Sequence, residues 1–298
     1  MSNLLIVLID GINYAAWLFI SAVGLTLIYG VMRVLNVAHA SFYSFGCYVA
    51  VTLAGYWFSH NYPPHLSFFA LFGASFVAGF AIGWILERFL LRYQYAKDEV
   101  VILLITYAVF LILDDVLKLI WGVDPYYASD PYELLGTFNI GEMTYPNYYL
   151  LMIGSAIVLS LGLTYMLKKT RFGKLLVSVI HDREISSAMG INVGRFFSLT
   201  FSFGCALAAI AGGITTPTIS VVPGLGVDVI VLSFAVVVTG GLGSLPGTAL
   251  AAIIMGVVRS FCVHYVPQLE LFVIFSVMAL VLVFRPRGLF SLAEARKI

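Results

Sequence analysis

The sequence predicts an all-α fold, a polytopic bundle of helices that crosses a membrane many times. Of its 298 residues, 61% are apolar and only 10% carry a formal charge. A soluble domain of this length needs far more polar and charged side chains to cover its surface. The apolar runs also reach the length of about 20 residues that a helix needs to cross the hydrocarbon core. We therefore expect a single transmembrane domain over 1–298, with eight or nine spans.

The apolar runs between the charged residues place the individual spans. The run 229–240 is short for a crossing, so it either crosses or re-enters the membrane. Ahead of the first span, Asp10 and Gly11 break the apolar pattern, and no basic residue starts a cleaved signal peptide. In chain order, the predicted spans are 12–31, 40–58, 66–87, 98–121, 148–167, 197–217, 229–240, 248–264 and 267–284.

The basic residues orient the bundle. With the N-terminus outside, fourteen of the 16 Lys and Arg residues fall on one side, which the positive-inside rule assigns to the cytoplasm. The loop 122–147 on the other side holds four acidic residues and no Lys or Arg. We therefore expect an N-terminus outside, an extracytoplasmic loop 122–147, a cytoplasmic segment 168–196 and a cytoplasmic C-terminus.

Segment 168–196 is the most informative stretch outside the spans. Its apolar residues recur at helical spacing from Phe172 to Ile180, which predicts a short amphipathic helix. Asp182 is placed to cap a second short helix, and Gly190 is placed to end it. Such an element either rests on lipid headgroups or docks into a partner protein.

Two blocks of glycine and polar residues interrupt the apolar runs, and a new helix follows each. Non-helical backbone at membrane depth is tolerated only where protein or a cavity surrounds it, and paired broken helices often mark a transport path. The alternative is two tight turns whose small residues allow close helix packing, and the sequence leaves both open. The candidate path residues are Asn36, His39, Ser41, Gly240, Gly241, Gly243 and Ser244.

Charged residues within the spans need partners, because an isolated charge is costly in lipid. Asp114 precedes Lys118 by four residues, the favourable order for an ion pair on one helix. Asp115 points about 100° away from Asp114, so we expect it to pair with Arg259, which lies in the outer half of a different span. Glu270 stands at a helix start, where an acidic residue favours the helix dipole.

Small residues recur every four positions at Gly79 and Gly83, and again at Gly204, Ala208 and Gly212. This spacing predicts close helix packing, which can include a contact with a second membrane subunit.

Several functional classes lack their sequence features. The net charge of +1 argues against capture of nucleic acid. Gly173 and Lys174 are followed by leucine and lack the upstream glycine of a phosphate-binding loop, and neither HExxH nor GxSxG occurs. The cysteines are far apart and sit in apolar stretches, so we interpret them as core residues. We expect no catalytic residue, no metal site and no bound cofactor.

Four stretches together resemble the permease subunits of branched-chain amino acid ABC transporters, of the LivH type. They are GLTLIYGVMRVLNVAHASFYSFGCYVA (24–50), TRFGKLLVSVIHDREISSAMGINVGR (170–195), GGLGSLPGTALAAIIMG (240–256) and FRPRGLF (284–290). At position 40 the chain has alanine where family members commonly have glycine, which puts the family's detailed packing in doubt there.

The resemblance implies a multi-pass subunit of the bacterial inner (plasma) membrane that hydrolyses no ATP itself. It implies coupling to two cytoplasmic ATPase subunits, which bind ATP and Mg, through the segment 170–195. It also implies a second permease subunit, LivM-like and non-identical, and an extracytoplasmic substrate-binding protein. The residues that we assign to docking on this basis are Gly173, Arg183, Glu184, Ala188 and Gly190.

By the resemblance, the cargo is a branched-chain or other apolar amino acid. The alternative is a secondary transporter of small polar solutes that is driven by an ion gradient, with Asp114 and Asp115 as coupling carboxylates. That class needs no basic docking segment, so dependence of uptake on ATPase subunits separates the two hypotheses.

Overall fold

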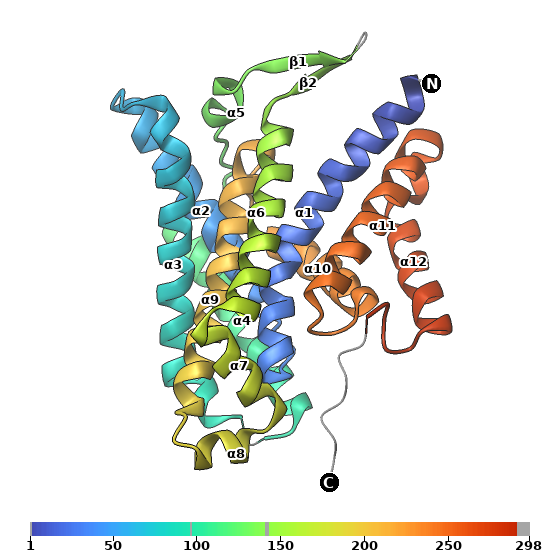
Figure 1. The fold of residues 1–298 in the computed structure, drawn as a ribbon. Coiled ribbons are helices and arrows are strands. Elements are labelled where there is room, and N and C mark those ends of the chain that lie inside the picture. The colour runs from blue at the N-terminus through green and yellow to red at the C-terminus, as the bar shows by residue number, and fades with distance from the viewer. Residues whose placement is uncertain (1, 96, 141–142, 291–298) are drawn as a thin grey trace.

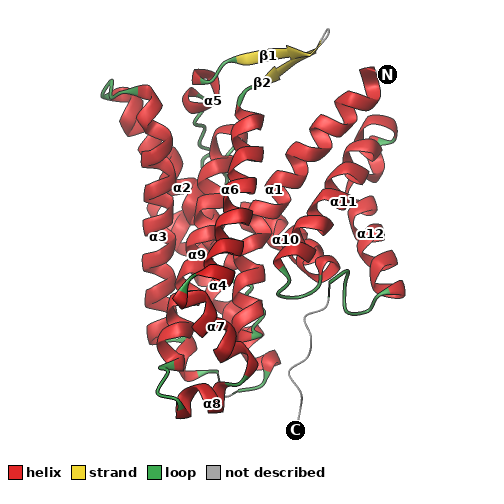
Figure 2. Cartoon of the chain, in the orientation of Figure 1, coloured by secondary structure: helices red, strands yellow, loops and turns green. Residues whose placement is uncertain are grey.

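The computed structural model describes residues 2–95, 97–140 and 143–290. Their regular structure is helical except for one antiparallel two-stranded hairpin (Figure 2). Seven helices among the described residues are long and apolar enough to cross a membrane. The all-α membrane bundle is thus confirmed, whereas its orientation and the count of eight or nine spans stay predictions.

The helices follow the predicted runs closely (Figure 1). Two of the predicted spans fall outside the set of seven: α2, which carries several serines and tyrosines, and α10, which is shorter. The long helices are α1 (Ser2–Met32), α2 (His39–Ser59), α3 (Ser67–Phe89), α4 (Glu99–Trp121), α6 (Tyr148–Lys169), α9 (Val193–Thr215), α10 (Leu225–Gly240), α11 (Leu245–Tyr265) and α12 (Glu270–Phe284).

The two ends of the bundle differ in what they carry (Figure 1). One end holds the N-terminus of α1, the short helix α5 (Asp130–Leu134) and the strands β1 (Thr137–Ile140) and β2 (Met143–Pro146). We call it the hairpin end. The other holds α7 (Arg171–His181) and α8 (Arg183–Ala188), and we call it the basic end. The predicted loop 122–147 and segment 168–196 therefore lie at opposite ends of the molecule.

Helix α1 differs from the prediction at its start. The predicted span is 12–31, whereas the helix is continuous from Ser2 through Asp10 and Gly11. A Cβ atom built on Gly11 would lie 2.9 Å from the Cα atom of Val257, so α1 and α11 touch at this glycine. Gly11 serves close helix packing here and does not interrupt the helix.

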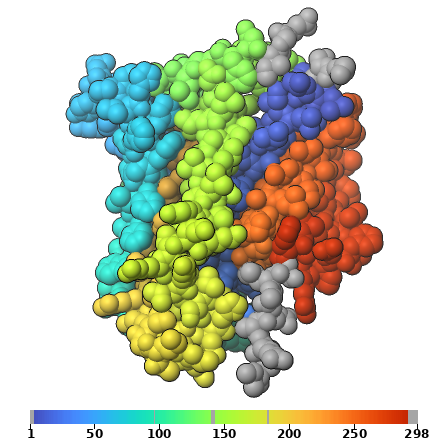
Figure 3. All heavy atoms as spheres, in the orientation of Figure 1, coloured from blue at the N-terminus to red at the C-terminus, as the bar shows by residue number. Residues whose placement is uncertain are grey.

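Helices α1 and α9 form the centre of the bundle, and both are largely buried. In Figure 3, α3, α6, α11 and α12 cover the face toward the viewer, and α1 shows between them. Helix α11 runs antiparallel to α1: Ser260 donates to the Val7 oxygen at 2.8 Å, and the hydroxyls of Thr248 and Thr26 lie 2.9 Å apart.

The evenly spaced small residues pack within the chain. A Cβ atom on Gly212 would lie 2.0 Å from the Tyr43 oxygen of α2, and one on Gly204 would lie 3.0 Å from the Gly24 oxygen of α1. Gly79 and Gly83 of α3 lie equally close to α9. These faces are therefore used by contacts inside one subunit, and the expected contact with a second permease through them is wrong.

The first predicted break is a non-helical segment, residues 33–38, that turns back along α1 toward the middle of the bundle. The imidazole Nε2 of His39, the first residue of α2, lies 3.2 Å from the Ser21 oxygen. At about 1.5 Å per residue, Ser21 lies roughly 16 Å from the end of α1. Residues 34–38, at about 3.3 Å each when extended, are long enough to cover that distance. Helix α2 thus begins deep inside the bundle.

The second predicted break is a tight turn between α10 and α11. Helix α10 has 16 residues, hence a length of about 24 Å, and it starts beside α2, where Gly226 contacts the Ala40 oxygen. It ends at Gly240, and α11 starts at Leu245. A Cβ atom on Gly30, near the end of α1, would lie 3.1 Å from the Gly243 oxygen, so this turn lies near the basic end.

Candidate functional site

The segment 168–196 forms two short helices that fold back against the bundle. Thr170 caps α7 by accepting a hydrogen bond from the Gly173 amide at 3.1 Å. Leu176 and Val179 on one face of α7 are fully buried, whereas Leu175 is exposed. The ring of Phe172 stacks on Phe196 of α9. The predicted amphipathic helix is confirmed, and its apolar face packs on protein.

Gly173 is buried in the elbow between α6 and α7. A Cβ atom at this position would lie 2.2 Å from the Met166 oxygen and 2.5 Å from the Leu167 Cα atom. Its backbone therefore approaches the end of α6 more closely than any larger residue allows. Gly173 is thus buried and positions α7, and its assignment to docking stays a prediction.

Helix α8 and its caps form the tip of the basic end. The Asp182 carboxylate accepts a hydrogen bond from the Ile185 amide at 2.9 Å, as the sequence predicts. Gly190 has φ +84°, and the amides of Gly190 and Ile191 donate to the oxygens of Ser187 and Ser186. The helix therefore ends at a glycine that adopts a left-handed conformation without strain.

Two of the proposed docking residues come together at this tip. Glu184 and Ala188 line a shallow groove of about 480 Å³ with Ser187 and Val193. Gly190 is exposed, with open space around its Cα atom. The side chain of Arg183 lies outside the described residues. Among the described residues of the predicted docking set, Glu184, Ala188 and Gly190 are accessible from outside.

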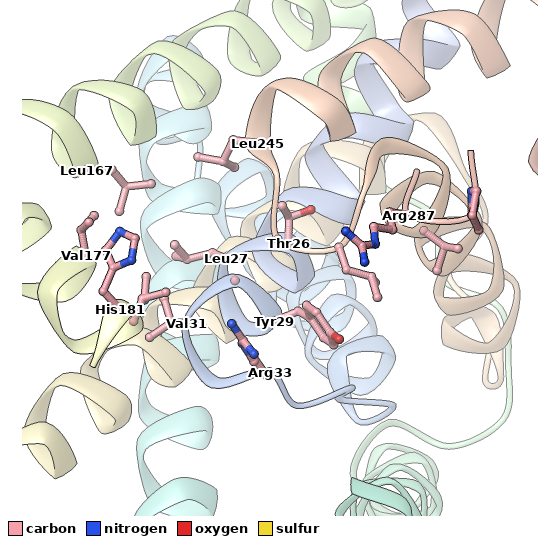
Figure 4. A pocket seen from close by; sticks show the side chains of 16 residues that line it. Thr26, Leu27, Tyr29, Val31, Arg33, Leu167, Val177, His181, Leu245 and Arg287 are labelled. Carbon is pink, nitrogen blue, oxygen red and sulfur yellow. The ribbon is translucent and has the colours of Figure 1, made fainter. Parts of the chain in front are cut away.

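A deeper cleft of about 580 Å³ lies beside the last turns of α1, at the basic end of the bundle (Figure 4). Its walls come from the last turns of α1, the α6–α7 elbow, the α10–α11 turn and the segment after α12. Arg33 and Tyr29 lie on one side of the view, and His181 lies opposite them. A second cleft of about 500 Å³, lined by Arg33, Lys97 and Glu184 among others, adjoins it.

The residues after α12 hold the α10–α11 turn in place. The amides of Leu289 and Phe290 donate to the oxygens of Thr239 and Gly240, at 2.9 and 3.0 Å. Gly241, with φ +102°, faces the Phe290 oxygen so closely that a Cβ atom would lie 2.3 Å from it. Ser244 caps α11 through the Gly247 amide. The predicted path glycines are therefore packing and turn residues, and of them Gly243 lines the deeper cleft.

The three candidate path residues of the first block are buried at the start of α2. Ser41 donates to the Phe110 oxygen at 3.3 Å, and His39 contacts the Ser21 oxygen. Neither polar atom of the Asn36 side chain has a partner among the described residues, although the residue is fully buried. None of the three lines the deeper cleft. Their assignment to the transport path stays a prediction.

The charged residues within the spans form pairs, but not all of the expected ones. Lys118 binds Asp114 at 2.7 Å, as the spacing predicts, and also binds Asp115 at 3.1 Å. The expected pair of Asp115 with Arg259 is wrong, since Arg259 binds Glu270 and lies over the Tyr14 ring, 3.7 Å from its centre. The Asp115 side chain is 75% exposed, and Lys118 of the same helix is its partner.

The two neighbouring aspartates should differ in their effect on stability. Asp114 is mostly buried, and it also accepts a hydrogen bond from the Gly224 amide ahead of α10 at 3.3 Å. We expect Asp114→Asn to lower the free energy of unfolding by about 1 kcal/mol, and Asp115→Asn to change it by less than about 0.5 kcal/mol. Thermal unfolding of the purified variants measures both. Equal losses would show that the link to Gly224 contributes nothing.

Sequence reasoning missed a buried carboxylate, that of Glu87. It lies at the end of α3 and accepts hydrogen bonds from the Tyr95 hydroxyl, at 3.0 Å, and from Ser198 of α9. Burial and the Glu87 carboxylate hold the pKa of Tyr95 above its ordinary value, so that the hydroxyl stays a donor. The signal was its spacing: Glu87 follows Gly83 and Gly79 at intervals of four, on the face that meets α9.

Comparison with known proteins gives a consistent result over nearly the whole chain. The sequence model of the family described as the permease component of the branched-chain amino acid transport system matches residues 7–284. The high-affinity branched-chain amino acid transport system permease protein BraD of Pseudomonas aeruginosa is 28% identical, over 98% of this chain and 97% of its own length. LivH of Escherichia coli, with a corresponding name, is 25% identical over 97% and 96%.

Among solved structures, a chain of PsaBC from Streptococcus pneumoniae, in complex with a Fab, has a similar fold. Its TM-score is 0.52 at 14% identity, over 93% of this chain and 91% of that chain. This likeness concerns the fold alone. The family match covers far more than half of the chain, and the resemblance inferred from the four sequence blocks is confirmed. The chain therefore belongs to the family of permease components of branched-chain amino acid transport systems.

Proposed function

We propose that this chain forms one half of the membrane path of an ABC importer for branched-chain or other apolar amino acids. The observation that carries the proposal is the tip at the basic end, where α7 is anchored by its buried face and α8 presents a groove to the outside. The permease names of its relatives agree with this role. The chain is a multi-pass protein of the inner membrane, and its described residues include seven helices suited to crossing it.

The basic end faces the cytoplasm in this proposal. Nearly all Lys and Arg residues lie in the segments that the positive-inside rule assigns to that side. The hairpin end, with the acidic loop 122–147, then faces outward and receives substrate from an extracytoplasmic binding protein. A second, non-identical permease of the LivM type completes the path.

The chain uses ATP only through its partners. Two cytoplasmic ATPase subunits bind ATP and Mg and supply the chemical step, and the present chain contributes a contact surface. Because α7 is clamped between the Gly173 elbow and Phe196, a push on α8 acts on α6, α9 and the end of α1. Movement of the ATPases then opens or closes the path by shifting packed helices against one another.

Filling the α8 groove should uncouple the permease from its ATPases. We expect Glu184→Arg combined with Ala188→Trp to lower the affinity for the ATPase subunits at least tenfold, since reversing a charge at an interface costs about 2 kcal/mol or more. Co-purification with the ATPases and ATP-driven uptake of leucine into reconstituted vesicles measure the loss. Uptake by the unmodified complex should persist when the proton gradient is collapsed.

The matched control is Glu133→Arg. Glu133 is also an exposed acid in a short helix, α5, but it lies at the opposite end of the bundle. This variant should keep normal ATPase binding. The proposed function fails if the groove variant still binds and stimulates the ATPases, or if the chain alone drives uptake with an ion gradient.

A further inference from the structure

The deeper cleft at the basic end has apolar walls and a rim of one charge sign. Most of its lining side chains are aliphatic and come from α1, α6, α7, α10 and α11. The Arg, Lys, His, Asp and Glu residues on its rim are Arg33, His181 and Arg287, all of them of basic type. Among the described residues, no Asp or Glu lines it. The cleft thus offers hydrocarbon contact next to a site for negative charge.

Arg33 occupies its position on this rim at a conformational cost. It follows the last residue of α1 with φ +54°, and its amide donates to the Tyr29 oxygen at 2.9 Å, as a left-handed residue does at a helix end. Glycine is the usual residue there, and a larger one pays a penalty. An interaction of the Arg33 side chain would offset this backbone penalty.

No carboxylate of the described residues neutralises Arg33. Arg33 takes part in none of the three ion pairs that Lys118 and Arg259 form with acidic residues. The adjoining cleft does hold Glu99, Asp182 and Glu184, but none of them comes within ion-pair distance of Arg33. Arg33 therefore stands between the two clefts with its charge open to a negatively charged ligand.

We propose that this cleft binds an anionic phospholipid of the cytoplasmic leaflet, with the phosphate at Arg33 and part of an acyl chain along the aliphatic walls. Basic pockets between helices at the cytoplasmic side are suited to acidic headgroups. Its volume lies in the range of sites that hold small organic molecules. A zwitterionic headgroup fits less well, because its ammonium group finds no acid in this cleft.

The aliphatic walls of the cleft favour a phospholipid over a soluble phosphate compound as the bound anion. Inorganic phosphate or a soluble phosphate ester would leave the aliphatic surface of the cleft in contact with water, whereas an acyl chain covers it. The assignment to the cytoplasmic leaflet rests on the proposed orientation. The binding measurement below does not, because it uses neither ATPases nor transport, so its failure and that of the proposed function are distinguishable.

The test is lipid competition on the purified full-length chain, followed by native mass spectrometry. With equal amounts of phosphatidylglycerol and phosphatidylcholine, we expect phosphatidylglycerol to be retained preferentially. Arg33→Asn should lower that preference about fivefold, the effect of one basic residue on an acidic lipid. Asparagine is chosen because it tolerates the left-handed conformation. Arg33→Gly, which adopts the same conformation without strain, takes its place should the first variant not fold.

The matched control is Arg285→Asn, in the same segment but outside the cleft lining. It should leave the preference unchanged. An equal loss in Arg285→Asn and Arg33→Asn would mean general attraction to the basic surface and would overturn the proposal. Displacement of phosphatidylglycerol by inorganic phosphate or glycerol phosphate would also overturn it, since the acyl chain would then contribute nothing.

Discussion

Gly46→Ala is expected to lower the free energy of unfolding by about 3 kcal/mol. A Cβ atom at Gly46 of α2 would lie 1.9 Å from the Ala209 oxygen and 2.6 Å from its Cα atom in α9. Both are backbone atoms of a central helix, so the two helices must move apart, and overpacking of this kind is costly. Thermal unfolding in detergent, followed by circular dichroism, measures the loss.

The control lies in the same helix. Gly55 also belongs to α2, but nothing lies within 4 Å of a Cβ atom built there. Gly55→Ala should therefore be neutral, or stabilising by about 0.5 kcal/mol, because alanine favours the helix. If both variants unfold at the same temperature, the contact between α2 and α9 is looser than described.

Gly173→Ala is expected to lower ATP-driven uptake more than tenfold while the bundle stays folded. A methyl group there meets the Met166 oxygen and the Leu167 Cα atom, so the elbow must open and α7 must tilt. The buried Leu176 and Val179 then lose their place against the bundle, and α8 moves with them. Leucine uptake by vesicles with the ATPases reports the effect, and the melting temperature reports the fold.

Gly162→Ala is the comparison for this variant. Gly162 lies in α6, on the N-terminal side of the elbow. Nothing lies within 4 Å of a Cβ atom built there. Uptake should remain normal. A Gly173→Ala protein that transports at full rate would show that the position of α7 does not control coupling, and the proposed mechanism would lose its main support.

The fold class could be predicted from the sequence because the membrane imposes it. Long apolar runs have one solution that satisfies every backbone group within the run, namely a helix. The caps of α8 were predictable for a similar reason, since Asp182 and Gly190 act on atoms a few residues away. The start of α1 was not, because Gly11 can mark a break or a contact, and only the position of α11 decides which.

Contacts between distant residues were predicted less well. Asp115 and Arg259 were expected to pair because they lie in corresponding halves of their spans, but depth fixes only one coordinate. The side on which each residue faces depends on helix rotation, and Arg259 turns toward Glu270 and Tyr14. The lone carboxylate of Glu87 was missed for the same reason: its partners Tyr95 and Ser198 come from two other segments.

The docking set was predicted in part, because residue type does not reveal exposure. Glu184 and Ala188 share a groove, whereas Gly173 is enclosed by the chain itself. The two glycine-rich blocks illustrate the same limit. Both interrupt helices as the sequence predicts. The first is a non-helical segment that runs back along α1, and the second is a tight turn held by hydrogen bonds from the residues after α12.

The hydrogen bonds between the α10–α11 turn and the residues after α12 can form only late in synthesis of the chain. The carbonyl groups of Thr239 and Gly240 receive their amide donors from Leu289 and Phe290, which the ribosome adds long after α10 has been made. Until then, the end of α10 has unsatisfied acceptors at a position packed against α1. This part of the bundle is therefore completed late in synthesis, whereas α2 and α3, which pack against each other, are free to associate while the chain is still being elongated.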